Sequence, residues 1–347
     1  MSGLFYFLLC NIPVDLRYFA GMKILVVRFS SIGDIVLTSP VLRCLKQQLA
    51  GSSIHFATKK QFSGLLESNP YVDKLFSIEK SVSEIAASLK NESYDFVVDL
   101  HHNIRSAQIK TLLGKRSGSF RKLNLRKWLM VNLKVNKLPD THIVDRYFET
   151  VQTLGVQNDG KGLDYFIPQK DEVATGTLPA EFHNGYIGFV IGAKHFTKQL
   201  PVEKIISICN KLNRPVILLG GKEDFDKGEL ICSQVEGGRI FNACGKYSLN
   251  QSASLVKQAE KIITHDTGLM HIAAAFRKEI VSVWGNTIPE FGMTPYFGDA
   301  EIRNLKSQVQ NLSCRPCSKL GYAKCPKGHF KCMNEINEDE IVKWIQA

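Results

Sequence analysis

The stretch KILVVRFSSIGDIVLTSPVLRCLKQQL, residues 23–49, decides the fold, because an apolar run gives way to a helical pattern within a few residues. A short run of β-branched residues followed by an amphipathic segment indicates a strand and then a helix. The alternation continues outward through SIHFAT (53–58), KLFSI (74–78), SVSEIAASLKN (81–91) and YDFVVDL (94–100). Such alternation predicts a parallel sheet with helices on its faces.

A second series with the same pattern begins near Tyr186, with YIGFVIG (186–192), VEKIISICNKL (202–212), RPVILLG (214–220), KIITHD (261–266) and EIVSVWG (279–285). The intervening segment from Gly155 to Asn184 is rich in Gly, Pro, Asp and Lys, as domain linkers are. We therefore predict an α/β protein with two doubly wound, Rossmann-like domains facing a central cleft. The expected divisions are an N-terminal extension (1–21), an N-terminal domain (22–170), a C-terminal domain (171–333) and a C-terminal helix (334–347).

The first 21 residues contain an apolar core of roughly a dozen residues, which is short of the about 20 needed to cross a bilayer. The segment also lacks the basic region that opens a signal peptide. Because a strand starts directly after Met22, that residue could be the natural start, with 1–21 as an upstream extension. A short interfacial anchor and an extra segment packed on the first domain are the alternatives.

Composition limits the class of protein. The chain has 347 residues, 44% of them hydrophobic and 22% charged, which excludes disordered and fibrous proteins and suffices for two cores. The net charge of +11 favours phosphates, nucleic acid or anionic membranes as partners. Five of the nine cysteines are scattered singly, which indicates a reducing compartment.

Residues 101–139 carry ten Lys and Arg residues and no acidic residue. Leucines, Trp128 and Met130 are interleaved with these charges, so the stretch resembles a basic amphipathic helix or loop. That pattern suits a phosphorylated lipid or an anionic membrane face. A solvated helix face is the plainer interpretation, and no nucleic-acid motif accompanies the charges.

Polar motifs follow two of the apolar strands in a way that favours anion binding. The segment RFSSIGDIVLTSP (28–40) places Ser31, Gly33 and Asp34 where a strand ends and a helix begins, at the edge that borders the ligand crevice. Asp34 could equally be a carboxylate that only stabilises a helix start. In VIGAKHFTKQLP (190–201), Thr197 and Lys198 suit an anion site, although loop lysines are often merely solvated.

Two further motifs lie in the second series. LLGGKED (218–224) places Glu223 after a strand and a Gly pair, which suits ribose hydroxyls but also describes an exposed loop carboxylate. THDTGLMHIAAA (264–275) is the most specific motif: Asp266, Thr267 and Gly268 open a helix whose free amides would bind a diphosphate. His271 faces either this space or the core. No G-x-G-x-x-G or Walker loop is present, which disfavours nicotinamide enzymes and P-loop proteins.

Four cysteines form a Cys-rich loop at 314–332, namely Cys314, Cys317, Cys325 and Cys332. Their spacing resembles a tetrahedral zinc site, but the turns are shorter than in common zinc ribbons. Free thiols that pack a loop, or two disulfides formed on oxidation, are the alternatives.

Together these motifs resemble the heptosyltransferases of glycosyltransferase family 9, which transfer heptose from ADP-heptose to the lipopolysaccharide inner core. The similarity runs from Met22 almost to the C-terminus and rests on residues 23–40, VVDLHHNIRSA (97–107), GAKHFTKQLP (192–201), HDTGLMHIAAA (265–275) and the cysteine-rich tail. It implies a GT-B fold, with the acceptor on the N-terminal domain and the nucleotide sugar on the C-terminal domain. Leu200, where several members have tryptophan, and the extra residues 1–21 depart from the family pattern.

The resemblance also implies roles for single residues. Asp34 matches the proposed general base, and Ser31 and Gly33 lie in the same segment, on the acceptor side. Lys198, with Thr197 beside it, matches the lysine that contacts the donor phosphates. Glu223 matches a carboxylate that binds ribose. The remaining matches are Asp266, Thr267, Gly268 and His271 around the diphosphate, and Asn103 and Arg105 toward the acceptor.

The implied reaction is a direct displacement with inversion that requires no metal or other cofactor, since the sequence has no D-x-D metal motif at a matching strand end. The implied partners are a nucleotide-sugar donor, a phosphorylated lipid-linked saccharide acceptor and an anionic membrane surface, with no nucleic acid. The implied place is the cytoplasm, peripheral to the inner face of the inner membrane. A GT-B transferase for another nucleotide sugar and a non-catalytic anion-binding protein remain as alternatives.

Overall fold

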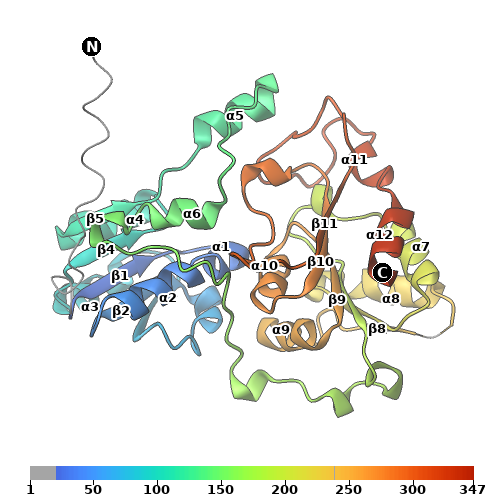
Figure 1. The fold of residues 1–347 in the computed structure, drawn as a ribbon, viewed down its shortest axis with the longest axis horizontal. Coiled ribbons are helices and arrows are strands. Elements are labelled where there is room, and N and C mark those ends of the chain that lie inside the picture. Colours follow the sequence, from blue (N-terminus) through green and yellow to red (C-terminus); the bar gives the residue numbers. More distant parts are fainter. Residues whose placement is uncertain (1–20, 238) are drawn as a thin grey trace.

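The computed structural model describes residues 21–237 and 239–347, and it contains two parallel sheets side by side (Figure 1). The order in the N-terminal sheet is β3-β2-β1-β4-β5. Its strands are β1 (Lys23–Val27), β2 (Ser53–Lys59), β3 (Lys74–Ile78), β4 (Phe96–Asp99) and β5 (Arg116–Ser119). The predicted segment 1–21 lies, except for Gly21, outside the described residues.

The C-terminal sheet repeats this plan in the order β11-β10-β9-β6-β7-β8. Its strands are β6 (Ile187–Val190), β7 (Val216–Leu219), β8 (Ile240–Asn242), β9 (Lys261–His265), β10 (Glu279–Trp284) and β11 (Asn304–Gln308). The prediction of two doubly wound domains is confirmed. In each sheet the strand order reverses at one place, between β1 and β4 in the first sheet and between β6 and β9 in the second. Ligands of doubly wound sheets bind beside such switch points.

Helices connect the strands and cover both sheets. Those of the first half are α1 (Ile32–Val36), α2 (Ser39–Gln48), α3 (Ser83–Asn91), α4 (Ile104–Leu113), α5 (Asn124–Leu133) and α6 (Ile143–Phe148). Those of the second are α7 (Val202–Leu212), α8 (Phe225–Gln234), α9 (Leu249–Gln258), α10 (Gly268–Ala275), α11 (Lys331–Asn334) and α12 (Glu338–Gln346). No described helix is long and apolar enough to cross a membrane.

Two helical regions differ from the prediction, and a third, α5, falls in the stretch expected to be a basic helix or loop. The helix expected after β1 is divided into α1 and α2, and Pro40 lies in the first turn of α2, where its missing N–H costs nothing. The terminal helix starts at Glu338 rather than 334, and it packs on α7 through Glu338, which accepts hydrogen bonds from Lys204 (2.8 Å) and Ser207. Helix α5 buries no side chain and projects from the N-terminal domain (Figure 1).

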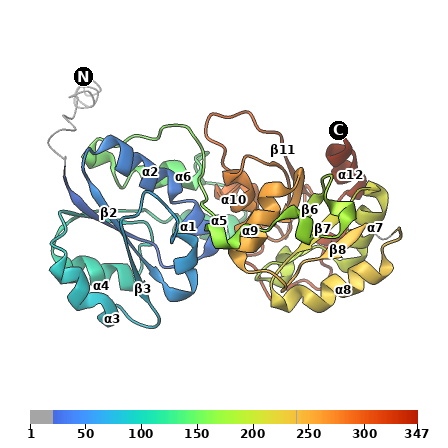
Figure 2. The same cartoon turned by 90° about the horizontal axis from the view of Figure 1, so that it is seen from below.

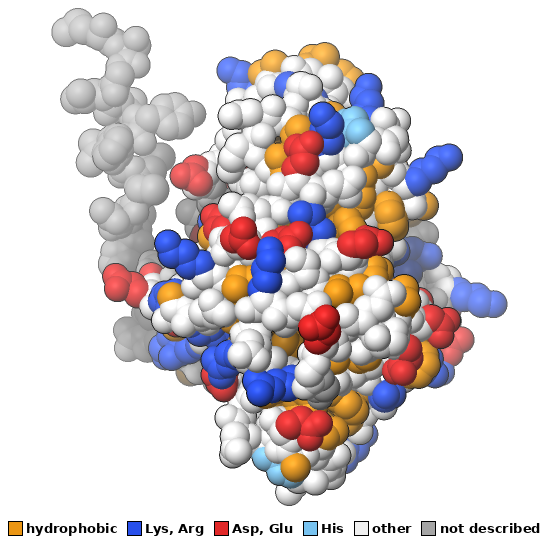
Figure 3. All heavy atoms as spheres, turned by 90° about the vertical axis from the view of Figure 1, so that its right-hand side faces the viewer, with side chains coloured by type: hydrophobic (Ala, Val, Ile, Leu, Met, Phe, Trp, Pro, Cys, Tyr) orange, Lys and Arg blue, Asp and Glu red, His pale blue; other side chains and the backbone are white. Residues whose placement is uncertain are grey.

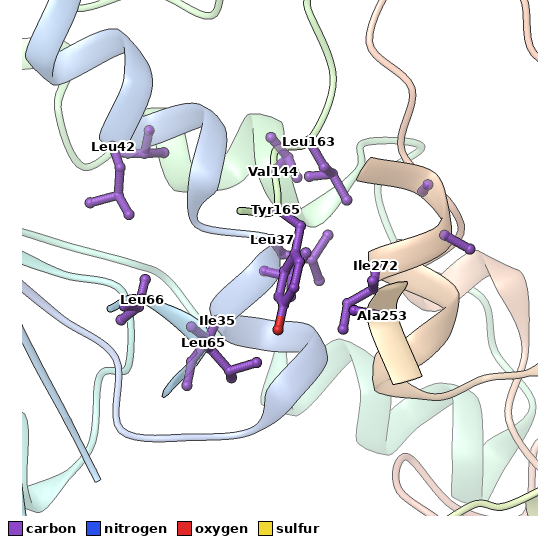
Figure 4. Packing of buried hydrophobic residues seen from close by; sticks show 14 of the residues in the cluster. Ile35, Leu37, Leu42, Leu65, Leu66, Val144, Leu163, Tyr165, Ala253 and Ile272 are labelled. Atoms are coloured by element: carbon purple, nitrogen blue, oxygen red, sulfur yellow. The ribbon is translucent and has the colours of Figure 1, made fainter. Parts of the chain in front are cut away.

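Apolar side chains fill the space where the two halves meet. One hydrophobic cluster includes Ile35 of α1, Leu37 directly after α1, Ile272 of α10 and Tyr165 of the linker. Figure 4 shows Tyr165 between α1 and the helices of the second half, and its hydroxyl donates a 2.5 Å hydrogen bond to Asn250. Seen from below, α1 and α10 occupy the junction of the two domains (Figure 2). This packing fixes how the two switch points face each other.

Candidate active site

The two switch points meet where α1 contacts α10. A Cβ atom added to Gly33 of α1 would lie only 2.5 Å from Cδ2 of His271, and one added to Gly268 would lie 2.5 Å from Cγ2 of Ile32. Such distances leave no room for a side chain at either glycine. The contact therefore brings the segment with Asp34 and the segment with Asp266 to the same place.

Asp34 is held by its own helix start. Ser31 is the N-cap of α1, and Asp34 occupies the N3 position of a capping box. Oδ2 of Asp34 accepts hydrogen bonds from the backbone N–H of Ser31 (3.0 Å) and from its hydroxyl (2.7 Å). Oδ1 pairs with the guanidinium of Arg28 at 2.5 Å. The side chain keeps 18% of its surface exposed, so Asp34 is both oriented and accessible.

Arg28 sets the protonation state of this carboxyl. Burial raises the pKa of Asp34, but the charge of Arg28 and the hydrogen bonds from Ser31 outweigh burial and bring the pKa below its ordinary value. Arg28 is itself almost buried and donates further hydrogen bonds to the carbonyls of Ser30 (2.8 Å) and Leu100. Asp34 is therefore ionised at neutral pH and able to accept a proton.

On the α10 side of this contact, the side chains of Asp266 and Thr287 hold a lysine at the start of α10. The Nζ of Lys198 lies 2.6 Å from Oδ2 of Asp266 and 3.2 Å from the Asp266 carbonyl. Thr287 donates a 2.9 Å hydrogen bond to the same Oδ2. Asp266 follows β9 directly, and Lys198 lies in the loop after β6, so the order of the central strands brings them together. The result is an ammonium group fixed beside a helix N-terminus.

The N-terminus of α10 has the features of an anion site. Thr267 is the N-cap with an extended backbone, and no side chain in the described chain caps the first turn. The first amides and the positive end of the helix dipole, together with Lys198, favour a diphosphate. Burial lowers the pKa of His271 to about 4, so its imidazole is neutral, and its Nδ1 has no hydrogen-bond partner in residues 21–237 and 239–347.

The structure separates the two carboxylates that follow β7. Glu223 is exposed, and its carboxylate lies so close to Gly221 that a Cβ there would be 2.4 Å from Oε2. Asp224 is buried and accepts hydrogen bonds from the Gly221 N–H (3.0 Å) and from Lys227 (3.0 Å). Asp224 thus shapes the loop, which leaves Glu223 as the carboxylate available to a ligand at this sheet edge.

Two residues expected on the acceptor side have local partners instead. Asn103 is the N-cap of α4, and its side chain accepts a 3.0 Å hydrogen bond from the Ser106 N–H. The guanidinium of Arg105 donates to the carbonyl of Lys80 at 3.2 and 3.3 Å. Both follow β4 at the correct edge of the sheet, but the structure shows no contact between them and Asp34.

The structure adds basic residues that the motifs did not single out. Burial and the charge of Arg146 lower the pKa of Lys127 to about 8. The negative charges of Asp34 and Asp266 raise this pKa, but by less. The Lys127 ammonium lies 5.1 Å from the ring centre of Phe291, which belongs to the C-terminal half of the chain. Burial, Arg28 and Lys122 lower the pKa of His101 to about 4. The acid-free run at 101–139 was the only sequence signal for this group.

The cysteines of the loop at 314–332 are free thiols, as are Cys44, Cys209, Cys232 and Cys244. None of the described cysteines is paired in a disulfide. No group of three or more His, Cys, Asp or Glu side chains in the described part of the chain is arranged to hold a metal ion.

Known proteins resemble this chain in sequence and in fold. The family model described as glycosyltransferase family 9 (heptosyltransferase) matches residues 82–322. Lipooligosaccharide heptosyltransferase 2 of Haemophilus ducreyi is 28% identical, over 93% of this chain and 98% of its own. A family 9 glycosyltransferase structure from Veillonella parvula has a TM-score of 0.72 at 22% identity, covering 94% of this chain and 97% of its own. The E. coli ADP-heptose LPS heptosyltransferase II structure has a TM-score of 0.69 at 20% identity, covering 94% and 98%. The chain therefore belongs to glycosyltransferase family 9.

Proposed function

We propose that this enzyme transfers heptose from ADP-heptose to a sugar hydroxyl of the lipopolysaccharide inner core. The observation that carries the proposal is the contact between α1 and α10, because it sets an ionised carboxylate beside Lys198 and a helix N-terminus, which would suit a diphosphate. The names of the relatives, heptosyltransferases of lipopolysaccharide and lipooligosaccharide, support heptose as the transferred sugar. The N-terminal domain (22–170) would hold the acceptor and the C-terminal domain (171–333) the donor.

The proposed reaction is a single displacement with inversion. Asp34 takes the proton of the acceptor hydroxyl while that oxygen bonds to the anomeric carbon. The bond from this carbon to the β-phosphate oxygen breaks, and its electron pair leaves with ADP. Each carboxylate oxygen of Asp34 can accept more than one hydrogen bond, so Ser31 and Arg28 orient the base without blocking it. General-base catalysis of this kind contributes about 10² to 10⁴-fold.

Charge on the departing ADP would be stabilised by Lys198 and by the amides of Thr267 and Gly268. These groups are held in place before the reaction, because Asp266 and Thr287 fix Lys198 and the helix fixes the amides. Glu223 is placed to accept hydrogen bonds from the ribose. His271, neutral and buried, would shape the site without adding charge.

The acceptor is proposed to be a phosphorylated, lipid-linked saccharide. Lys127 is partly exposed and forms no ion pair with a carboxylate within the described chain, so its charge is available to acceptor phosphates. The exposed apolar side chains of α5, with the basic residues of 101–139, would contact an anionic membrane. The enzyme would then act in the cytoplasm, peripheral to the inner face of the inner membrane.

Calorimetric titration with ADP, UDP and GDP, combined with turnover of ADP-heptose, tests the proposal. We expect selective ADP binding, and we expect Lys198→Ala to weaken both binding and turnover. Lys194→Ala is the matched control, because this exposed lysine lies on the same loop and forms no ion pair in the structure as described. A preference for UDP or GDP would support another nucleotide sugar, and no nucleotide binding would support a non-catalytic anion-binding protein.

A further inference from the structure

A second acid-free basic stretch lies in the C-terminal domain. Residues 302–334 contain seven Lys and Arg residues and no Asp or Glu. With the 101–139 stretch, the two segments carry 17 basic side chains, and the rest of the chain carries 27 against 33 acidic ones. All of the net positive charge of the protein therefore comes from these two segments.

The two stretches meet in space although about 160 residues of chain separate them. Lys134, at the end of α5, donates hydrogen bonds to the carbonyls of Pro316 (2.7 Å) and Cys314 (3.3 Å). Lys319 of this stretch is also close enough to Lys122 to affect it. The pKa of Lys122 is lowered by burial, by the charge of Arg28 and by the charge of Lys319. In Figure 1, α5 and the loop that precedes α11 extend to the same upper edge of the molecule.

This edge also exposes large apolar side chains from both domains. On α5, Leu125, Trp128 and Leu133 are 72%, 53% and 57% exposed. On the 302–334 stretch, Leu320 and Tyr322 are 60% and 43% exposed. Figure 3 shows hydrophobic and basic side chains gathered at the upper end of the molecule, with most acidic side chains further down.

We propose that the 302–334 stretch and α5 together form one docking face for an anionic lipid bilayer, so that both domains contact the membrane. Cations beside exposed leucine and aromatic side chains match a surface with anionic headgroups over an apolar interior. Exposed leucines would be of no use to a nucleic-acid surface, which is read by charge, stacking and hydrogen bonds. This inference deepens the proposed function, which rests on a lipid-linked acceptor.

The 302–334 stretch also reaches the donor site, which gives this docking a consequence. The Thr197 hydroxyl accepts a 2.8 Å hydrogen bond from the Tyr322 N–H, and the Thr197 N–H donates to the Tyr322 carbonyl at 3.2 Å. Arg315 donates to the carbonyl of Thr287 at 2.9 Å. The loop proposed to contact the membrane therefore also holds the segments that carry Lys198 and Thr287. A bilayer that binds both domains would keep the active site near the membrane surface.

Vesicle co-sedimentation of the full chain tests this surface with acceptor-free vesicles, either phosphatidylcholine alone or with phosphatidylglycerol. The C-terminal variant is Leu320→Ser with Lys324→Gln and Lys327→Gln. The N-terminal variant is Leu125→Ser with Arg126→Gln and Lys137→Gln. The matched control, Leu230→Ser with Lys161→Gln and Lys170→Gln, removes one exposed leucine and two exposed lysines elsewhere.

We expect wild type and control to bind the anionic vesicles in a salt-dependent way and the neutral vesicles weakly. Each lysine near an anionic surface contributes about 1 kcal/mol, or about fivefold, so either docking variant should bind about 30-fold more weakly or worse. If the C-terminal variant binds the anionic vesicles as tightly as wild type, the proposal is overturned. It is also overturned if wild type binds neutral vesicles equally well, or binds duplex DNA more tightly than the anionic vesicles. Turnover of a delipidated acceptor should stay normal in the variants. If the wild-type enzyme itself does not turn over this acceptor, the result counts against the proposed function rather than against the docking face.

Discussion

The substitution Gly33→Ala tests whether the contact between α1 and α10 assembles the active site. The added Cβ would lie 2.5 Å from Cδ2 of His271, 3.2 Å from its Nε2 and 3.5 Å from Cα of Gly268. Ordinary contact begins near 3.4 Å, so α1 and α10 must separate by about 1 Å. A displacement of about 1 Å at reacting groups can cost about 10²-fold in rate, and overpacking typically costs about 1–3 kcal/mol of stability. We therefore expect kcat/KM to fall about 100-fold.

Steady-state kinetics with saturating and limiting donor would measure this loss, with Gly176→Ala as control, because a Cβ there has no atom within 4 Å. His271→Ala removes the clashing ring, so the double variant Gly33→Ala with His271→Ala should lose no more activity than His271→Ala alone. Activity of Gly33→Ala within threefold of wild type would refute the reasoning. The reasoning also fails if the double variant loses as much activity as the sum of the losses, in free energy, from Gly33→Ala and His271→Ala.

Three further predictions follow from the charges and hydrogen bonds of the site. Replacing Arg28 with Met removes the charge that offsets the burial of Asp34 and raises the pKa of Asp34. The acid limb of the kcat/KM profile should therefore move to higher pH, and Arg28→Lys should move it less. Because the pKa of Lys127 is about 8, its charge is lost as pH rises through 8; the acceptor KM should rise there, and Lys127→Arg should flatten that rise. Thr287→Val removes a hydrogen bond to Asp266 and should weaken ADP binding up to about tenfold by calorimetry, which an unchanged Kd would contradict.

The central strands and the edge strand β3 could be predicted from the sequence, but the edge strands β5 and β11 could not. Buried runs such as that of β1 are continuous and apolar, because helices cover both faces of a parallel sheet. By contrast, β5 reads RSGS and β11 reads NLKSQ, and no hydrophobic pattern marks either as a strand. Their pairing with β4 and β10 comes from tertiary structure, which overrides weak local preference.

The site divides in a similar way. Asp34, Lys198 and Asp266 could be predicted because each follows an apolar strand, and strand ends border the crevice of a doubly wound sheet. Arg28 lies inside a quoted motif, yet its pairing with Asp34 depends on how the chain turns after β1. Lys127 approaches Phe291 of the C-terminal half only because α5 projects from the N-terminal domain, and no spacing in the sequence encodes that approach.

The most direct test of the account is the single-turnover rate of Asp34→Asn at saturating ADP-heptose, in a protein whose ADP affinity is verified by calorimetry. Asparagine keeps the shape of the side chain but cannot take the proton. We expect nearly normal ADP binding and a rate about 10² to 10⁴-fold below wild type. A rate within a few-fold of wild type would contradict the assignment of Asp34 as the base.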